Sequence, residues 1–268
     1  VGATLLLRMP RGVRLTPAGE SFLEDARAIL ARAQQASVRA RERQADQRST
    51  LRLGLMPSAT QSFLPGLVAR LQASGLALEL EAREISPSSR QLQALRNAEI
   101  DLGLVRQGVE DLPPETVASI DDPYCLAVPV DHALARHSGP MALKLAAHAC
   151  FVSFARHHES DYFDQTAALC LEAGFRPDIR HEAGQFAGVL AMVNCGLGVA
   201  IVPASCVTAT NTCTVFHRLA GSRYRSRLIL VQQPKSAADR WSRQVADLAT
   251  EELERLGTMA KAMVAKLS

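Results

Sequence analysis

Apolar side chains between residues 17 and 46 recur every three or four positions, which is the period of one face of an α-helix. Thr16 and Pro17 precede this stretch, and threonine followed by proline is typical of a helix start. The pattern predicts one continuous helix over 17–46, roughly 45 Å long at 1.5 Å per residue. Small alanines on its apolar stripe favour close packing against a helix of a second subunit. Packing on the globular body of the same chain is the alternative.

Residues 8–16 combine apolar and basic side chains around Gly12, which is typical of a small β-hairpin. From Leu51 onward the period changes, and short strands alternate with helices. The predicted strands are 51–55, 76–82, 100–105, 124–128, 151–154, 179–182, 199–202, 213–217 and 227–231. The predicted helices are 58–73, 87–97, 160–172, 186–194 and a long one from Ala237.

This alternation predicts an α/β fold with a mostly parallel sheet. About 220 residues exceed what one small sheet needs, so we expect two lobes with a cleft between them. Ligands of such folds collect at the carboxyl ends of strands and the amino ends of helices.

The composition narrows the class of protein. Of the 268 residues, 47% are hydrophobic and 21% are charged, which fits a globular chain of about two domains and not a disordered one. The longest apolar runs, 187–193 and 197–204, are far shorter than the roughly 20 residues that span a bilayer. The chain starts at Val1 without a signal-peptide pattern. Its six cysteines form no C-x-x-C motif, so we expect buried thiols in a reducing cytoplasm, without a disulfide or zinc framework.

The positive charge is concentrated at the N-terminus. Residues 1–48 hold nine arginines and five acidic residues, a net charge of +4, whereas the remaining 21 basic and 22 acidic residues sum to −1. A basic arm of this kind indicates an anionic partner.

Residues 5–30 read LLLRMPRGVRLTPAGESFLEDARAIL. This segment resembles the wing and linker-helix signature of LysR-type transcriptional regulators, roughly L-F-x-R-x-x-R-G-V-x-L-T-x-A-G-x-x-F-x-x-x-A-R-x-I-L, with Leu6 in place of the usual Phe. Residues 51–55, 95–104 and 193–203 are similar to the effector domain of that family. The resemblance implies a cytoplasmic regulator that binds DNA and a small-molecule effector, and that forms a homodimer or homotetramer.

In this family a helix-turn-helix precedes the wing, and the sequence starts after it. What precedes the linker is a remnant of the winged helix-turn-helix, in which Arg8, Arg11 and Arg14 would contact DNA phosphates without reading bases. We therefore expect no operator-specific binding from the chain as given. If the chain is a fragment, the resemblance implies that its parent is a DNA-binding regulator.

The resemblance also implies domain boundaries and a site. The wing remnant would cover 1–16, the linker helix 17–48, lobe I 49–124 with 233–268, and lobe II 125–232. Lobes of this type are similar to periplasmic binding proteins. The closest branch senses aromatic acids and their ring-cleavage products, such as muconate. Its effector contacts match Ser58, Ala59, Ser88, Arg106, His157 and Phe186.

Serine hydroxyls at helix starts suit a carboxylate, and Arg106 would supply its counter-charge. A second, more buried effector site of that branch is not expected, because the matching positions are Asp121, Gly184 and Gln185. Each assignment has an alternative. The two serines could be plain helix caps, Arg106 a surface ion-pair partner, and Phe186 part of the core.

Two other classes of function compete. A solute-binding protein of the periplasmic transport type would share the two lobes but should carry a signal peptide and no basic helix. An enzyme is not expected, because no G-x-S-x-G, H-E-x-x-H or Walker motif occurs. No cofactor or metal site is expected either, since the adjacent His157 and His158 make a poor pair of ligands.

Overall fold

The structure is a computed structural model. It describes residues 1–9, 12–23, 25–27, 29–30, 33, 37, 49–107, 112–156, 162–207, 213–221, 224–233 and 240–267. The predicted site residues Arg11 and His157 lie outside the described residues.

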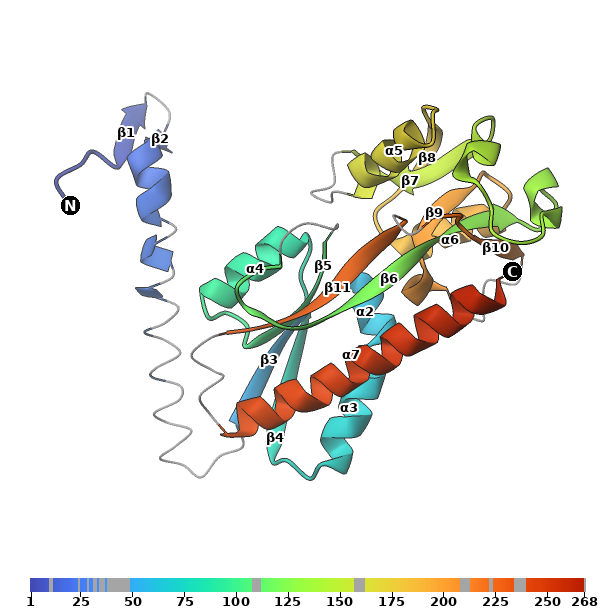
Figure 1. Cartoon of the computed structure of the whole chain (residues 1–268). Helices are drawn as coiled ribbons and strands as arrows, with labels where there is room; N and C mark the ends of the chain where they lie inside the picture. The colour runs from blue at the N-terminus through green and yellow to red at the C-terminus, as the bar shows by residue number, and fades with distance from the viewer. Residues whose placement is uncertain are drawn as a thin grey trace.

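The N-terminal arm consists of a hairpin followed by a helix (Figure 1). Strands β1 (Leu6–Met9) and β2 (Gly12–Leu15) pair antiparallel, which confirms the predicted hairpin. Thr16 caps the helix, because its Oγ1 accepts the Gly19 N–H at 2.9 Å and donates to the Thr4 carbonyl at 2.7 Å. The helix packs closely on the residue before β1, since a Cβ on Gly19 would lie 2.0 Å from the Leu5 carbonyl oxygen. Residues 17–23, 25–27, 29–30, 33 and 37 are helical, and the rest of the predicted linker lies outside the described residues.

Lobe I is built on three parallel strands with helices on both sides. The strands are β3 (Ser49–Leu55), β4 (Leu78–Glu84) and β5 (Leu102–Gln107). The helices are α2 (Pro57–Ser62), α3 (Leu64–Ala73), α4 (Ser88–Arg96) and α7 (Arg240–Lys266). The single helix predicted over 58–73 is therefore two helices. They are separated at Phe63, because Pro65 lacks the N–H that would continue the ladder.

Lobe II contains β7 (Cys150–Phe154) and β8 (Asp178–Ala183), which form a two-stranded parallel sheet, and β9 (Ala200–Pro203) and β10 (Thr214–Arg218), which belong to the main sheet. Its α-helices are α5 (Tyr162–Glu172) and α6 (Phe186–Asn194), and its short 3-10 turns are η1 (Ala133–Arg136), η2 (Leu143–Ala146) and η3 (Ala204–Cys206). The pair β7–β8 joins the rest through a bridge between Phe151 and Val199. The predicted bounds of α6 coincide with those observed.

Two long strands connect the lobes and correct the predicted sheet. Strand β6 (Thr116–Pro129) pairs with β11 (Arg225–Gln232) through its first half, and with β9 and β10 through its second half. All of these pairings are antiparallel, as is β11 with β5, so the sheet is mixed and not mostly parallel. The sequence-based boundary assigned β11 to lobe II, but the strand hydrogen bonds along its length to β5 of lobe I.

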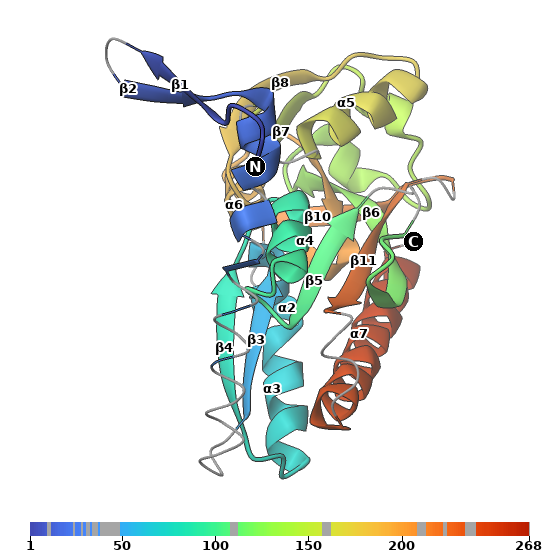
Figure 2. The ribbon, with the colours of Figure 1, turned by 90° about the vertical axis from the view of Figure 1, so that its left-hand side faces the viewer.

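Helix α7 crosses both lobes (Figures 1 and 2). Its Leu253 and Leu256 belong to a core cluster of lobe I, and its Ala260 and Val264 to one of lobe II. The predicted two-lobed α/β fold is confirmed. Among the described residues, no helix combines the length and apolarity that crossing a bilayer requires.

The cysteines differ in burial. Cys125 and Cys170 are buried as expected, but Cys195 and Cys213 are exposed, so the expectation of buried thiols is wrong for these two. Apolar neighbours along the chain do not determine which side of an element a thiol lies on.

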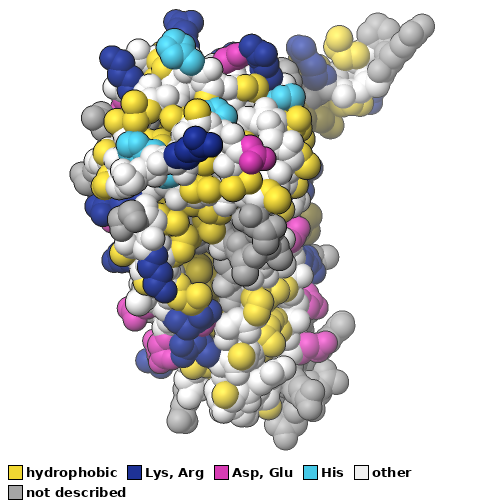
Figure 3. All heavy atoms as spheres, turned by 90° about the vertical axis from the view of Figure 1, so that its right-hand side faces the viewer, with side chains coloured by type: hydrophobic (Ala, Val, Ile, Leu, Met, Phe, Trp, Pro, Cys, Tyr) yellow, Lys and Arg dark blue, Asp and Glu magenta, His cyan; other side chains and the backbone are white. Residues whose placement is uncertain are grey.

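Histidine side chains gather over lobe II (Figure 3). One of them, His217 on β10, is only 3% exposed and packs edge-on against His137, with ring centroids 6.0 Å apart. Within the part of the chain that the structure describes, both Nε2 atoms are buried without a hydrogen-bond partner. Burial first, and then the neighbouring His137, lowers the pKa of His217 below its ordinary value.

This lowered pKa predicts a loss of stability in mild acid. Below about pH 6.5 the unfolded chain binds a proton at His217 that the folded chain does not bind, so the free energy of unfolding decreases as the pH decreases. We expect His217→Gln to reduce this pH dependence in urea unfolding between about pH 7 and pH 5. The exposed His148, changed to Gln, is the matched control. Equal pH dependence in both variants and the wild type would contradict the assignment.

Candidate ligand-binding site

A cavity of about 180 Å³ lies between the two lobes. Lobe I contributes the start of α2, the loop before α4 and the end of β5, whereas lobe II contributes β7, α5 and the start of α6. The lining residues are Met56, Pro57, Ser58, Ser86, Pro87, Ser88, Ser89, Arg106, Phe154, Tyr162, Gln165, Gly184, Gln185 and Phe186. A second cavity, of about 510 Å³, shares the wall formed by Pro57, Ser58, Gln185 and Phe186 and extends towards α7.

Four of the six predicted effector contacts line the first cavity, namely Ser58, Ser88, Arg106 and Phe186. Ala59 does not line it. This residue is 2% exposed in the core of lobe I, and its N–H donates to the Met56 carbonyl at 2.9 Å. His157 lies outside the described residues.

Ser88 connects α4 to the neighbouring strand. Its Oγ donates to the Arg106 carbonyl at 2.8 Å and accepts the Arg106 N–H at 3.1 Å. The capping position of α4 is Pro87, and no side chain caps this helix. Ser88 is therefore not a plain helix cap. Its hydroxyl proton already has an acceptor, so the donors that the start of α4 can offer to the cavity are the N–H groups of its first turn, which have no intrahelical partner, and the hydroxyl of Ser89.

Ser58 lies one residue into α2, whose capping position is Met56, so it is not a helix cap either. Ser58 and Cys206 of lobe II both line the second cavity. Burial raises the pKa of the Cys206 thiol to about 11, so Cys206 is protonated at neutral pH. Residues of both lobes thus form the wall of the second cavity.

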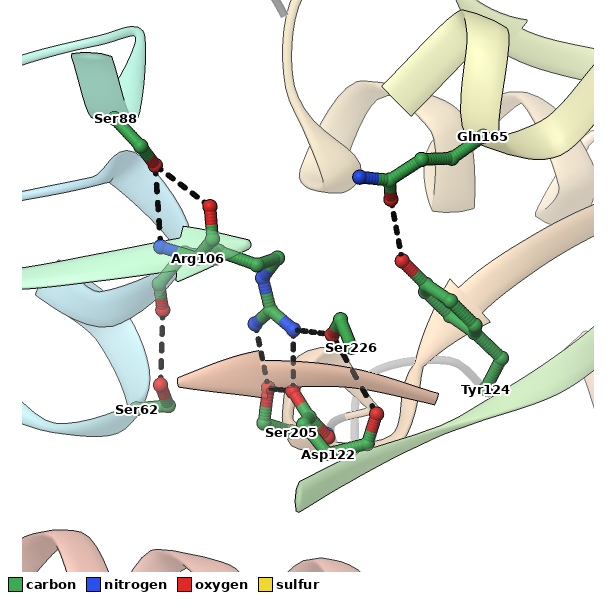
Figure 4. Close-up of polar contacts among 9 residues, drawn as sticks. Ser62, Ser88, Arg106, Asp122, Tyr124, Gln165, Ser205 and Ser226 are labelled. Atoms are coloured by element: carbon green, nitrogen blue, oxygen red, sulfur yellow. Dashed lines mark hydrogen bonds and ion pairs between the residues drawn. The ribbon is translucent and has the colours of Figure 1, made fainter. Parts of the chain in front are cut away.

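Arg106 is held by a buried polar network (Figure 4). Its Nη1 donates to Asp122 Oδ2 and to Ser226 Oγ, both at 2.6 Å, and its Nη2 donates to Ser205 Oγ at 3.1 Å. Asp122 is fully buried. Burial would lower the pKa of Arg106, but the Asp122 carboxylate outweighs it, and the pKa lies above its ordinary value. The alternative of a surface ion pair is therefore wrong, because this ion pair is internal.

Three aromatic rings form the lobe II wall. Phe154, Tyr162 and Phe186 have ring centroids 4.5 to 4.9 Å apart, and the Arg106 guanidinium lies 5.9 Å from the Phe186 centroid. Phe186 is both core and wall, since it is 8% exposed and still lines the cavity. Burial raises the pKa of Tyr162 well above its ordinary value, so its hydroxyl stays neutral.

The electrostatics of the cavity come mainly from backbone dipoles. Of the described residues that line it, Arg106 is the only charged one, and Asp122 offsets that charge. The starts of α4 and α6 face the cavity from opposite lobes, and neither has a side-chain cap. Uncapped N–H groups attract negative charge. The arrangement suits a small ligand with an acceptor group and a flat apolar body.

Several site residues were not predicted from the sequence, namely Asp122, Tyr162, Gln165, Ser205 and Ser226. Only Asp122 had a usable signal. It is one of two adjacent acidic residues in β6, and because neighbouring residues of a strand lie on opposite faces, one of the two is expected to face the core and to need a partner.

Comparison with known proteins identifies the family. Residues 44–254 match the model of the LysR substrate binding domain. The chain belongs to the LysR family of transcriptional regulators. It is 30% identical over 219 residues to the HTH-type transcriptional regulator AlsR of Bacillus subtilis, covering 82% of this chain and 72% of AlsR. It is 32% identical over 224 residues to the Hca operon transcriptional activator HcaR of Escherichia coli, covering 83% of this chain and 74% of HcaR.

A solved structure shares the fold. The C206 mutant of Corynebacterium glutamicum OxyR matches with a TM-score of 0.66 and 21% identity, over 100% of this chain and 82% of OxyR. The LysR family assignment does not favour the alternative of a periplasmic transport protein.

The buried network predicts unequal effects for two adjacent acids. Asp122→Asn leaves the Arg106 charge buried without its counter-charge, so we expect a loss of about 3–5 kcal/mol in the free energy of unfolding. The carboxylate of Asp121 is 42% exposed and lies 3.5 Å from Arg227 and 3.6 Å from Arg225. Asp121→Asn should therefore change stability by less than about 1 kcal/mol. Urea unfolding of both variants tests this, and equal losses would contradict it.

Proposed function

We propose that this LysR-family regulator binds a small carboxylate between its two lobes. The observation that carries the proposal is the convergence of Ser58, Ser88, Arg106 and Phe186 on one cavity. They are far apart in the sequence and are brought together only by the fold. Their convergence supports the effector contacts that the family resemblance implies.

The chemistry of the two walls supports an aromatic or muconate-like acid. The carboxylate lies towards the first turn of α4 and Ser58, where N–H groups and a hydroxyl are available. The flat body lies against Phe154, Tyr162 and Phe186. A ligand that contacts both walls favours one arrangement of the lobes over others, and so it shifts their population.

The N-terminal arm supports oligomerisation. Phe22, Ile29 and Leu30 of the helix are 42%, 66% and 65% exposed in a single chain. Such large apolar side chains gain most by packing on the same helix of a second copy. We infer a homodimer or homotetramer whose geometry changes when the effector binds.

The hairpin supports a contact to the DNA backbone. Arg8 and Arg14 are exposed. Arg8 is opposite Val13 and Arg14 is opposite Leu7, so the two arginines project from opposite faces of the hairpin. Together with the +4 charge of residues 1–48, they add affinity for phosphates and not sequence recognition. Such a regulator acts in the cytoplasm, where its DNA is.

The site is tested by comparing two serines of α2. Ser58 lines the first cavity, whereas Ser62 lines only the second and donates its hydroxyl to the Ser58 carbonyl. We expect Ser58→Ala to weaken binding of benzoate or muconate about 10- to 100-fold, since it removes one hydrogen bond to a charged group. Ser62→Ala should leave the affinity within about twofold. Calorimetry measures both, and equal affinities in the two variants would exclude Ser58 as a contact.

The oligomer is tested by removing residues 1–48. If the linker helix joins the subunits, the shortened chain should have a lower mass in light scattering than the full chain at equal concentration. An unchanged mass would show that the lobes assemble without the arm. Circular dichroism of the shortened chain controls for loss of folding.

A further inference from the structure

Arg106 belongs to lobe I but is bonded to lobe II. Its backbone lies in β5, opposite Leu228 of β11. Its Nη2 donates to Ser205 Oγ of η3, and its guanidinium lies over the Phe186 ring of α6. Only 11% of the side chain is exposed. One rigid side chain therefore spans the seam between the lobes.

The partners of Arg106 lie where the connecting strands change lobes. Asp122 of β6 is opposite Ser226 of β11 in the pairing that joins β6 to lobe I, and two residues later Tyr124 is opposite Pro203 of lobe II. Asp122 also accepts from Ser205, from its N–H at 3.0 Å and from its hydroxyl at 2.5 Å. Arg106 and Ser205 thus meet on the same buried carboxylate.

We propose that Arg106 is a positioning residue that fixes the angle between the lobes, and that it is not the counter-ion of a bound carboxylate. Its charge is already offset by Asp122 at 2.6 Å. Both of its terminal nitrogens have acceptors, in Asp122, Ser226 and Ser205. A ligand that claimed this charge would leave Asp122 buried without a partner, which is costly.

One N–H donor of the guanidinium lies next to the cavity and connects it to the hydrogen bonds of Arg106 with Asp122, Ser226 and Ser205, which we call the latch. Among the described residues, Arg106 Nε is buried without a hydrogen-bond partner, and Arg106 lines the cavity. If an acceptor atom of a bound ligand accepts a hydrogen bond from this N–H, the guanidinium group rotates. Its hydrogen bond to Ser205 then changes as well. This last step rests on the proposed function. The latch itself holds the ligand-free molecule.

The experiment compares two serines that bond the same guanidinium, in the full chain without ligand. Ser205→Ala removes the two hydroxyl bonds that join η3 to Arg106 and Asp122 and keeps the N–H bond to Asp122, whereas Ser226→Ala removes a bond to a strand of the lobe I sheet. We expect Ser205→Ala to increase the radius of gyration in X-ray scattering. Amide exchange at 186–190, the start of α6, should increase about tenfold or more, since the hydrogen bonds of the Ser205 hydroxyl to Arg106 and Asp122 are both lost. Ser226→Ala should change neither quantity.

Arg106→Lys provides a second test that keeps the charge. A lysine ammonium can pair with Asp122 but has no planar fork to reach Ser205 at the same time. We expect it to reproduce the scattering and exchange of Ser205→Ala. The proposal would be overturned if Arg106→Lys had the radius of gyration and amide exchange of the wild type. Equal changes of these two quantities in the Ser205 and Ser226 variants would also overturn it. Because no ligand is present, a failure of benzoate or muconate to bind would not affect this result.

Discussion

The ion pair between Arg106 and Asp122 is the interaction on which the arrangement of the two lobes depends. Taking two charges out of water costs several kcal/mol per ion, and attraction offsets this only when the remaining hydrogen-bonding groups are also satisfied. Here the Ser226 and Ser205 hydroxyls and the Ser205 N–H satisfy most of the remaining hydrogen-bonding groups of Arg106 and Asp122. A buried pair of this kind contributes little net stability but tolerates few geometries. The pair lies where the two lobes meet, so the geometry that it requires also fixes the angle between the lobes.

The topology explains why a single side chain has this influence. Each lobe has its own core clusters, so each is stable against small displacements of the other. The covalent connections are β6 and β11, which cross as one antiparallel pair, and helix α7 packs on both lobes. The contacts of Asp122 and Ser205 lie at that crossing and therefore select among arrangements that the cores alone would permit.

Secondary-structure elements could be predicted from the sequence more accurately than contacts between residues that are distant along the chain. The bounds of α6 and the Thr16 cap follow from local pattern and side-chain chemistry, so they were predictable. The relative direction of the strands could not be predicted, because apolar and polar residues alternate in the same way in parallel and antiparallel strands. The family resemblance located Ser58 and Ser88, but Ser205 lies 83 positions from Asp122, and no local pattern links the two. The bond of Ser88 to Arg106 was hidden for the same reason.

The two kinds of positive potential at the cavity have different consequences for selectivity. A full charge on Arg106 would bind any anion, but Asp122 offsets it. What remains are the uncapped starts of α4 and α6, each equivalent to roughly half an elementary charge and confined to the first turn. Such dipoles act only on a group placed directly before them. Under the proposed function, a carboxylate would be held only when its body fits against Phe154 and Phe186, so shape, more than charge, would distinguish one acid from another.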